Sequence, residues 1–100
     1  MNIRLLSWNI NSVRLRINSL KKIIKKFEPN IVCLQETKCP NESFPYDDIK
    51  KIGLKNIHVN GIKGYHGVCI ATNLKVENVE KKDFCQKLDG RHISLKLKIK

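Results

Sequence analysis

The chain has 100 residues, and its 20 Lys and Arg against 9 Asp and Glu give it a net charge of +11. This length allows one domain with a single core and excludes a large multidomain enzyme. The charge favours a polyanionic partner such as nucleic acid or an acidic membrane surface, although an AT-rich coding sequence would enrich lysine without any such role. The sequence has no apolar run of membrane-spanning length and no signal-peptide pattern, so we expect a cytoplasmic protein with no membrane partner.

The first third of the chain predicts a strand, a helix and a second strand. Residues 3–8 form a short apolar run typical of a buried strand, and polar loop-forming residues follow it at 9–12. Residues 14–27 repeat apolar side chains at helical spacing with lysines mostly on the other face, and Pro29 cannot continue that helix. The continuous apolar run at 31–34 predicts a strand that is buried on both faces.

The remainder of the chain predicts further strands and one more short helix. The expected elements are a helix over 46–52 that ends at Gly53, and strands over 57–59, 67–72 and 93–99. The pattern at Val76 and Val79 is ambiguous. Cys33 and Cys69 lie inside apolar runs and are expected to be small buried residues. The strand at 93–99 has one wholly apolar face with no later segment to cover it, which indicates a longer domain that has been cut short.

Polar side chains gather where the first two predicted strands end. The first strand is followed by Asn9, and the second by Glu36 within the stretch 34–38. The helix between the strands lets them lie side by side, so their polar ends would meet at one edge of a sheet. Amides, a carboxylate and a lysine at such an edge suit a hard cation and a phosphate, because Mg²⁺ takes oxygen ligands. The alternative is that Glu36 is a solvated charge at a strand end and Asn9 an ordinary turn residue.

Four sequence blocks together resemble one family. They are Ser-Trp-Asn-Ile-Asn-Ser-Val-Arg (7–14), Ile-Val-Cys-Leu-Gln-Glu-Thr-Lys (31–38), Gly-Tyr-His-Gly-Val (64–68) and Asp-Gly-Arg-His-Ile (89–93). Their order and spacing resemble the exodeoxyribonuclease III family, the abasic-site (AP) endonucleases of the endonuclease/exonuclease/phosphatase superfamily. The resemblance implies an α/β (α+β) fold in which residues 1–100 form the N-terminal part of a four-layer α/β/β/α sandwich of the DNase I type.

The resemblance also implies a metal-dependent activity. Enzymes of this family hydrolyse DNA phosphodiesters 5′ to abasic sites and at 3′ ends with a divalent metal, Mg²⁺ or Mn²⁺. Glu36 matches the family's metal-binding glutamate, and Asn9 matches the asparagine beside the metal and the scissile phosphate. One position departs from the family pattern, since Ser12 stands where many members carry glycine.

The implied partner is double-stranded DNA that contains abasic sites or 3′ ends. The residues that match DNA-contacting positions are Asn11, Arg14, Lys38, Gly64 and Tyr65. The family's later blocks, which supply a catalytic tyrosine, an aspartate with its asparagine and a histidine with its partner, have no counterpart here. No complete catalytic set is therefore present, and we expect this chain alone to be inactive.

Three interpretations of the chain stay open at this point. It is part of a DNA repair nuclease whose missing half is supplied elsewhere, for example by a second chain. Alternatively, it is a basic fragment that binds DNA without cutting it, or a non-functional gene remnant.

Overall fold

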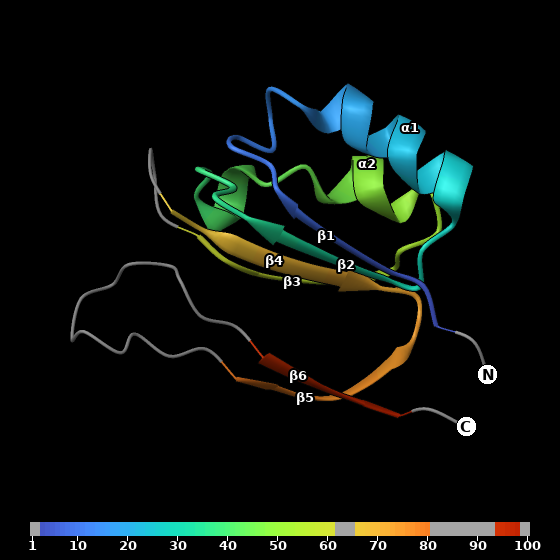
Figure 1. The fold of residues 1–100 in the computed structure, drawn as a ribbon. Helices are drawn as coiled ribbons and strands as arrows, with labels where there is room; N and C mark the ends of the chain where they lie inside the picture. Colours follow the sequence, from blue (N-terminus) through green and yellow to red (C-terminus); the bar gives the residue numbers. More distant parts are fainter. Residues whose placement is uncertain (1–2, 62–65, 81–93, 99–100) are drawn as a thin grey trace.

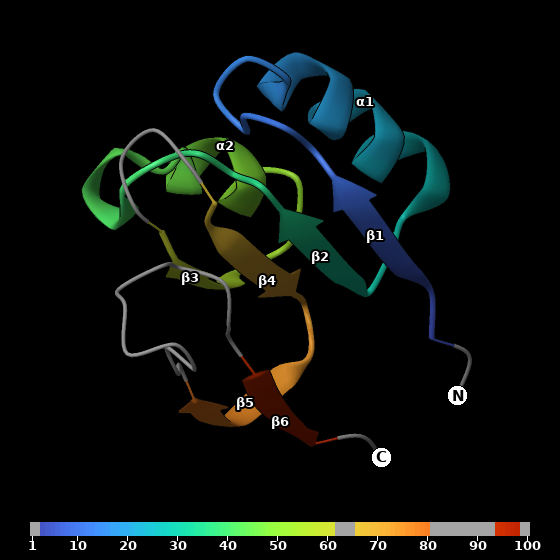
Figure 2. The ribbon, with the colours of Figure 1, turned by 60° about the vertical axis from the view of Figure 1, so that its left-hand side comes forward.

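The computed structural model describes residues 3–61, 66–80 and 94–98. Two helices cover one face of a four-stranded sheet, and a two-stranded sheet lies on the side away from the helices (Figures 1 and 2). The elements in chain order are β1 (Leu5–Asn9), α1 (Ile17–Phe27), β2 (Ile31–Gln35), the short 3-10 helix η1 (Asn41–Ser43), α2 (Tyr46–Lys50), β3 (Asn56–Asn60), β4 (Val68–Thr72), β5 (Lys75–Glu80) and β6 (Ser94–Lys98). The predicted α/β class is confirmed, and a helical layer and two sheet layers of the expected sandwich lie within the described residues.

Strand pairing brings the carboxyl ends of β1 and β2 to one edge of the sheet. β1 runs parallel to β2, with Leu5 opposite Ile31 and Asn9 opposite Gln35. β2 and β3 each pair antiparallel with β4, so the strand order is β1-β2-β4-β3 and the start of β4 lies beside the end of β2. β1 includes Asn9, which the sequence placed in a loop, because the ladder with β2 continues as far as Gln35.

Helix α1 begins at Ile17, later than the apolar repeat predicts. The residues before it are held by the edge of the sheet. The Val13 amide donates to the Thr37 carbonyl at 3.0 Å, and Arg16 Nε donates to the Ile10 carbonyl at 2.7 Å. These bonds hold the chain against the sheet, so the helix begins only after Arg16.

Polar contacts end helix α1 and link it to α2. α1 stops where Glu28 turns left-handed, with φ 48°, and donates its amide to the Ile24 carbonyl just before Pro29. An ion pair of 2.8 Å between Lys21 and Asp48 links α1 to α2, and the hydrogen bond from Lys21 holds the pKa of the Asp48 carboxyl below its usual value. Among the described residues, no helix has both the length and the apolar character needed to cross a membrane.

The hydrophobic core lies between the helices and the four-stranded sheet. Its most fully buried large side chains are Ile10, Val13, Leu20, Val32, Leu34, Ile49 and Leu54. Trp8 packs half-buried against this core. Both α-helices and all strands of the four-stranded sheet therefore contribute side chains to one continuous apolar cluster.

β2 is fully buried on one face only, contrary to the prediction. Val32 and Leu34 are each 1% exposed, whereas the alternate residues of the strand, Cys33 included, are half-buried. The reason is that both helices pack on the same face, so the second face of the strand is covered less completely. Cys69 is buried as predicted, and burial raises the pKa of its thiol.

The ambiguous segment around Val76 and Val79 forms β5, which pairs antiparallel with β6. Val79 lies opposite Leu95 and Val76 opposite Leu97, with a register shift between Val76 and Asn78. The strand predicted near the end of the sequence is therefore confirmed as β6. Because residues 75–80 pair with it, the ambiguous segment is a strand.

Replacing a core leucine of α1 tests whether this cluster holds the fold together. Leu20 is 0% exposed, and Leu20→Ala is expected to lower the free energy of unfolding by about 2–5 kcal/mol, because it leaves a cavity. Leu15→Ala is the matched control, since Leu15 is 79% exposed. Urea unfolding followed by circular dichroism measures both variants. Equal losses of stability would contradict the described core.

Candidate functional site

Backbone hydrogen bonds extend the sheet past the ends of β1, β2 and the start of β4. The amides of Ile10, Ser12 and Val13 donate to the carbonyls of Gln35, Glu36 and Thr37 at 2.9–3.0 Å. The amides of Thr37 and Lys38 donate in turn to the carbonyls of Gly67 and His66 at 3.1 and 2.7 Å. We call residues 10–13, 36–38 and 66–67 the edge loops, because these bonds hold them together along one edge of the sheet.

Left-handed backbone conformations are concentrated in the edge loops. Apart from Glu28 at the end of α1, the described non-glycine residues with positive φ all lie here: Asn11 (49°), Ser12 (86°), Glu36 (55°), Lys38 (51°) and His66 (55°). Each such residue costs of order 1 kcal/mol or more and persists only where surrounding contacts hold it. Clusters of strained residues occur preferentially at active sites and ligand sites. The strained residues thus lie at the ends of β1 and β2, where the sequence predicted a functional site.

Glu36 carries the carboxylate of this edge, and His66 lies beside it. His66 Nδ1 is 3.5 Å from Glu36 Oε1, and the Nδ1 atom is buried. The Glu36 side chain is 36% exposed, so its carboxylate is accessible from solvent. His66 is not among the site residues predicted from the sequence. Two signals pointed to it: it lies in the block at 64–68 that resembles the family, and it directly precedes Gly67, a glycine that a close backbone approach requires.

The Gly67 position brings the loop before β4 against the loop after β2. Gly67 has φ 94°, and a Cβ atom there would meet Thr37 Oγ1. Thr37 is itself 1% exposed, which is rare for a polar side chain. The absence of a side chain at Gly67 therefore lets the two loops pair through their backbones.

Asn9 lies at the end of β1, on the face of the sheet away from the helices. It alternates with the half-buried core residue Trp8 and shares its exposed face with Ser7. Gln35 Nε2 donates to Ser7 Oγ at 3.3 Å on this face. Asn9 and Glu36 therefore come to the same sheet edge, as the sequence predicted, from two adjacent parallel strands.

The predicted DNA-contacting residues fall into two groups. Asn11 and Lys38 lie in the edge loops, and Arg14 directly follows the first of these loops. An Arg14 guanidinium nitrogen lies 3.5 Å from the Lys38 carbonyl oxygen, so it bridges the first two loops. Gly64 and Tyr65 lie outside the described residues.

The donor atoms at this edge have the right chemistry for a hard divalent cation. Glu36 supplies carboxylate oxygens and Asn9 an amide oxygen, which are ligands that Mg²⁺ accepts. Among the residues that the structure describes, no group of three or more His, Cys, Asp or Glu side chains is placed to hold a metal. The edge therefore fits part of a magnesium or manganese site, with the other ligands to come from elsewhere.

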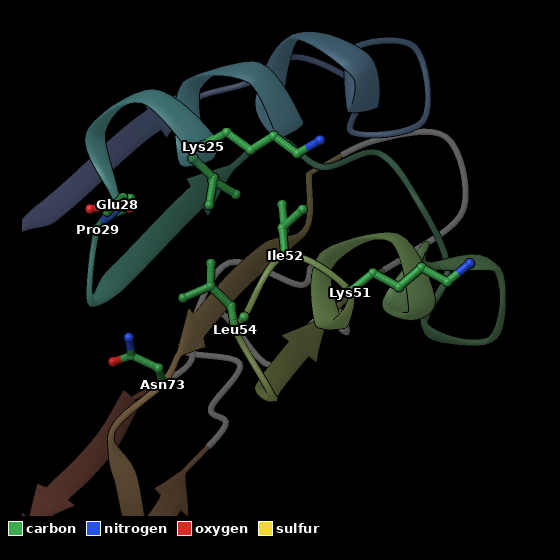
Figure 3. Close-up of a pocket in the computed structure, with 9 residues that line it drawn as sticks. Lys25, Glu28, Pro29, Lys51, Ile52, Leu54 and Asn73 are labelled. Atoms are coloured by element: carbon green, nitrogen blue, oxygen red, sulfur yellow. The ribbon is translucent and has the colours of Figure 1, made fainter.

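A pocket of about 560 Å³ opens at the opposite end of the sheet, between the end of α1 and the segment after α2 (Figure 3). Its lining includes Lys25, Glu28, Lys51 and Asn73. The Lys51 amine points away from Glu28 and Asn73 (Figure 3), and the negative C-terminal end of α1 opposes an anion here. None of the predicted site residues that the structure describes lines this pocket, so it is separate from the edge loops.

Comparison with known proteins identifies the family. Residues 6–97 match the model of the Endonuclease/Exonuclease/phosphatase family. The chain belongs to this family. It is 39% identical over 70 residues to exodeoxyribonuclease III of Haemophilus influenzae, covering 70% of this chain and 26% of that protein. The resemblance drawn from the four sequence blocks is confirmed at the level of this family, and the similar protein from Haemophilus influenzae carries the name exodeoxyribonuclease III.

Solved structures agree with this assignment. An AP endonuclease from Archaeoglobus fulgidus superposes with a TM-score of 0.87 and 32% identity, covering 96% of this chain and 37% of that one. The 3′ phosphatase NExo from Neisseria, solved with a product DNA hairpin, gives a TM-score of 0.85 over 96% of this chain and 38% of its own. Its identity of 24% shows the shared fold alone. The chain spans 26–38% of the length of these three relatives.

The close approach at Gly67 is testable with a matched pair of glycine variants. Gly67 and Gly53 have φ 94° and 104°, but an added Cβ meets an atom within 4 Å only at Gly67. We expect Gly67→Ala to lower the free energy of unfolding by about 1–3 kcal/mol more than Gly53→Ala does. Adding Thr37→Ala to Gly67→Ala removes the clashing oxygen and should recover part of the difference. Urea unfolding gives all three values, and equal losses for the two glycine variants would refute the clash.

At Ser12 the backbone conformation predicts the opposite effect, a gain of stability on substitution. Ser12 has φ 86° and stands where the sequence pattern of the family often has glycine, which adopts this conformation without steric cost. Ser12→Gly is therefore expected to raise the free energy of unfolding by about 0.5–1 kcal/mol. Ser19→Gly within α1 is the control and should lower it, because glycine is unfavourable inside a helix. A loss of stability in Ser12→Gly would show that the serine side chain is needed there.

Proposed function

We propose that this chain forms part of the active site of a DNA repair nuclease. The proposed activity of the complete nuclease is hydrolysis of phosphodiester bonds in double-stranded DNA, 5′ to abasic sites and at 3′ ends, with Mg²⁺ or Mn²⁺. The observation that carries the proposal is the solvent-accessible Glu36 carboxylate, held on strained edge loops beside the end of β1, where Asn9 lies. Membership of the Endonuclease/Exonuclease/phosphatase family supports it.

The roles of the residues follow from the chemistry of phosphodiester hydrolysis. The reaction needs an activated water, stabilisation of charge at the phosphate and help for the leaving oxygen. A bound divalent cation polarises phosphoryl oxygens and lowers the pKa of a bound water. Glu36 and Asn9 would hold that cation, while Asn11, Arg14 and Lys38 would pair with the DNA backbone. Gly64 and Tyr65 are proposed to meet DNA on the far side of the site.

The chain supplies only part of this machinery. Its described residues offer one carboxylate at the edge, and the sequence has no counterpart of the blocks that bring the family's catalytic tyrosine, aspartate and histidine. We therefore infer that the 100 residues alone do not cleave DNA. The remaining groups would come from further sequence, in the same polypeptide or in a second chain.

An incision assay tests this proposal. The purified chain with Mg²⁺ is expected to leave a duplex carrying one abasic site intact. Co-expression with the C-terminal remainder of the Haemophilus influenzae relative is expected to restore incision, and Glu36→Gln should reduce that incision on the order of 10²-fold or more, because a metal ligand is lost. Glu42→Gln, which alters an exposed carboxylate in η1, is the control and should not reduce it.

Two results of this assay would contradict the proposal. Incision by the chain alone that Glu36→Gln abolishes would show that the missing blocks are not required. Restored incision that survives Glu36→Gln would remove Glu36 from the metal site.

Salt dependence of DNA binding tests the proposed phosphate contacts. Each phosphate that a lysine neutralises adds about one to the slope of log affinity against log salt. We expect Lys38→Gln to lower this slope by about one and Lys22→Gln, on the exposed face of α1, to leave it unchanged. Fluorescence anisotropy with a labelled duplex over a series of salt concentrations measures the slopes. Equal effects of the two substitutions would indicate binding through net charge without a defined site.

A further inference from the structure

The imidazole of His66 is placed against the Glu36 carboxylate by the backbone on both sides. The His66 carbonyl accepts the Lys38 amide at 2.7 Å, and the next carbonyl, that of Gly67, accepts the Thr37 amide at 3.1 Å. Glu36 itself is held through its own carbonyl, which accepts the Ser12 amide at 2.9 Å. The two side chains therefore meet because their backbones are fixed relative to each other.

The contact is directed at one carboxylate oxygen. His66 Nδ1 faces Glu36 Oε1 at 3.5 Å, a contact without hydrogen-bond geometry, and this nitrogen is buried, while the His66 side chain as a whole is 25% exposed. An imidazole that carries a proton on Nδ1 can donate toward Oε1. A glutamate has three rotatable side-chain bonds, so a partly exposed Glu36 without such a neighbour would sample several orientations.

We propose that His66 is a positioning residue for Glu36. Its imidazole lies against Oε1 and limits the orientations open to the carboxylate, so that a cation or a phosphate-bearing ligand meets a pre-organised oxygen. The orientation of Glu36 is a property of the metal-free protein, whereas the benefit for a cation rests on the proposed function. Groups that orient a metal ligand in this way typically change metal affinity by tenfold or more.

Nuclear magnetic resonance of the metal-free chain tests the positioning directly. Ring nitrogen shifts of His66 report which nitrogen carries the proton, and three-bond couplings report the Glu36 side-chain rotamer. We expect a proton on Nδ1 and one dominant Glu36 rotamer in the natural chain. His66→Ala should give averaged couplings at Glu36, whereas His58→Asn, in β3 at the far side of the sheet, should not.

A second pair of variants separates positioning from packing. In His66→Asn the amide nitrogen takes the place of Nδ1, and asparagine tolerates the φ of 55° at this position. In His66→Gln the amide is displaced along the side chain. We expect the Asn variant to restore the single Glu36 rotamer and the Gln variant to fail. The proposal would be overturned if Glu36 kept the same dominant rotamer in His66→Ala as in the natural chain. If His66→Ala unfolds, the same dominant rotamer in both the Asn and the Gln variants would overturn it.

Titration with Mn²⁺ distinguishes this inference from the proposed function. Paramagnetic broadening of the Glu36 signals is expected in the natural chain, to be lost in Glu36→Gln, and to need about tenfold more Mn²⁺ in His66→Ala. Broadening that is absent from the natural chain would overturn the proposed metal site, while the rotamer result would still decide the role of His66. Broadening that depends on Glu36 and is unchanged in His66→Ala would overturn the positioning role and leave the metal site standing.

Discussion

The backbone ladder that continues beyond β1, β2 and the start of β4 is the constraint on which the rest of this structure depends. Amides of the first edge loop bind carbonyls of the second, and amides of the second bind carbonyls of the third. These bonds join segments that are far apart in the sequence and attach the loops to the sheet. The same bonds delay the start of α1 and hold several residues in left-handed conformations.

The free energy gained by burying the core offsets the backbone strain in the edge loops. Both helices pack on one face of the four-stranded sheet and bury a continuous cluster of aliphatic side chains. Burial of such side chains stabilises the domain by more than a few strained residues destabilise it. Ile10 and Val13 link the two features, because they are buried in the core and also belong to the first edge loop. The site is therefore held by the same packing that forms the fold.

The edge loops present one carboxylate, neighbouring amides and basic side chains at the carboxyl ends of parallel strands. We propose that this arrangement is part of a site for a cation and a phosphate, and the chain belongs to the Endonuclease/Exonuclease/phosphatase family. The Glu36 carboxylate lies beside His66, which comes from another edge loop. Glu36 is therefore in contact with a second loop and is not an isolated charge at a strand end. The assignments of Gly64 and Tyr65 stay predictions, as they lie outside the described residues.

The sequence alone determined the alternation of strands and helices, the family and the position of Asn9 and Glu36 at one edge. These features follow from local periodicity and from short motifs, which act over a few residues. Tertiary structure alone decided that β2 is fully buried on one face, that Val76 and Val79 join a strand, and that Ser12 turns left-handed. It also brought His66 to Glu36 and Gly67 to Thr37. The reason is physical: each of these features depends on hydrogen bonds or packing between segments distant in the chain, and no local pattern encodes which segments will meet.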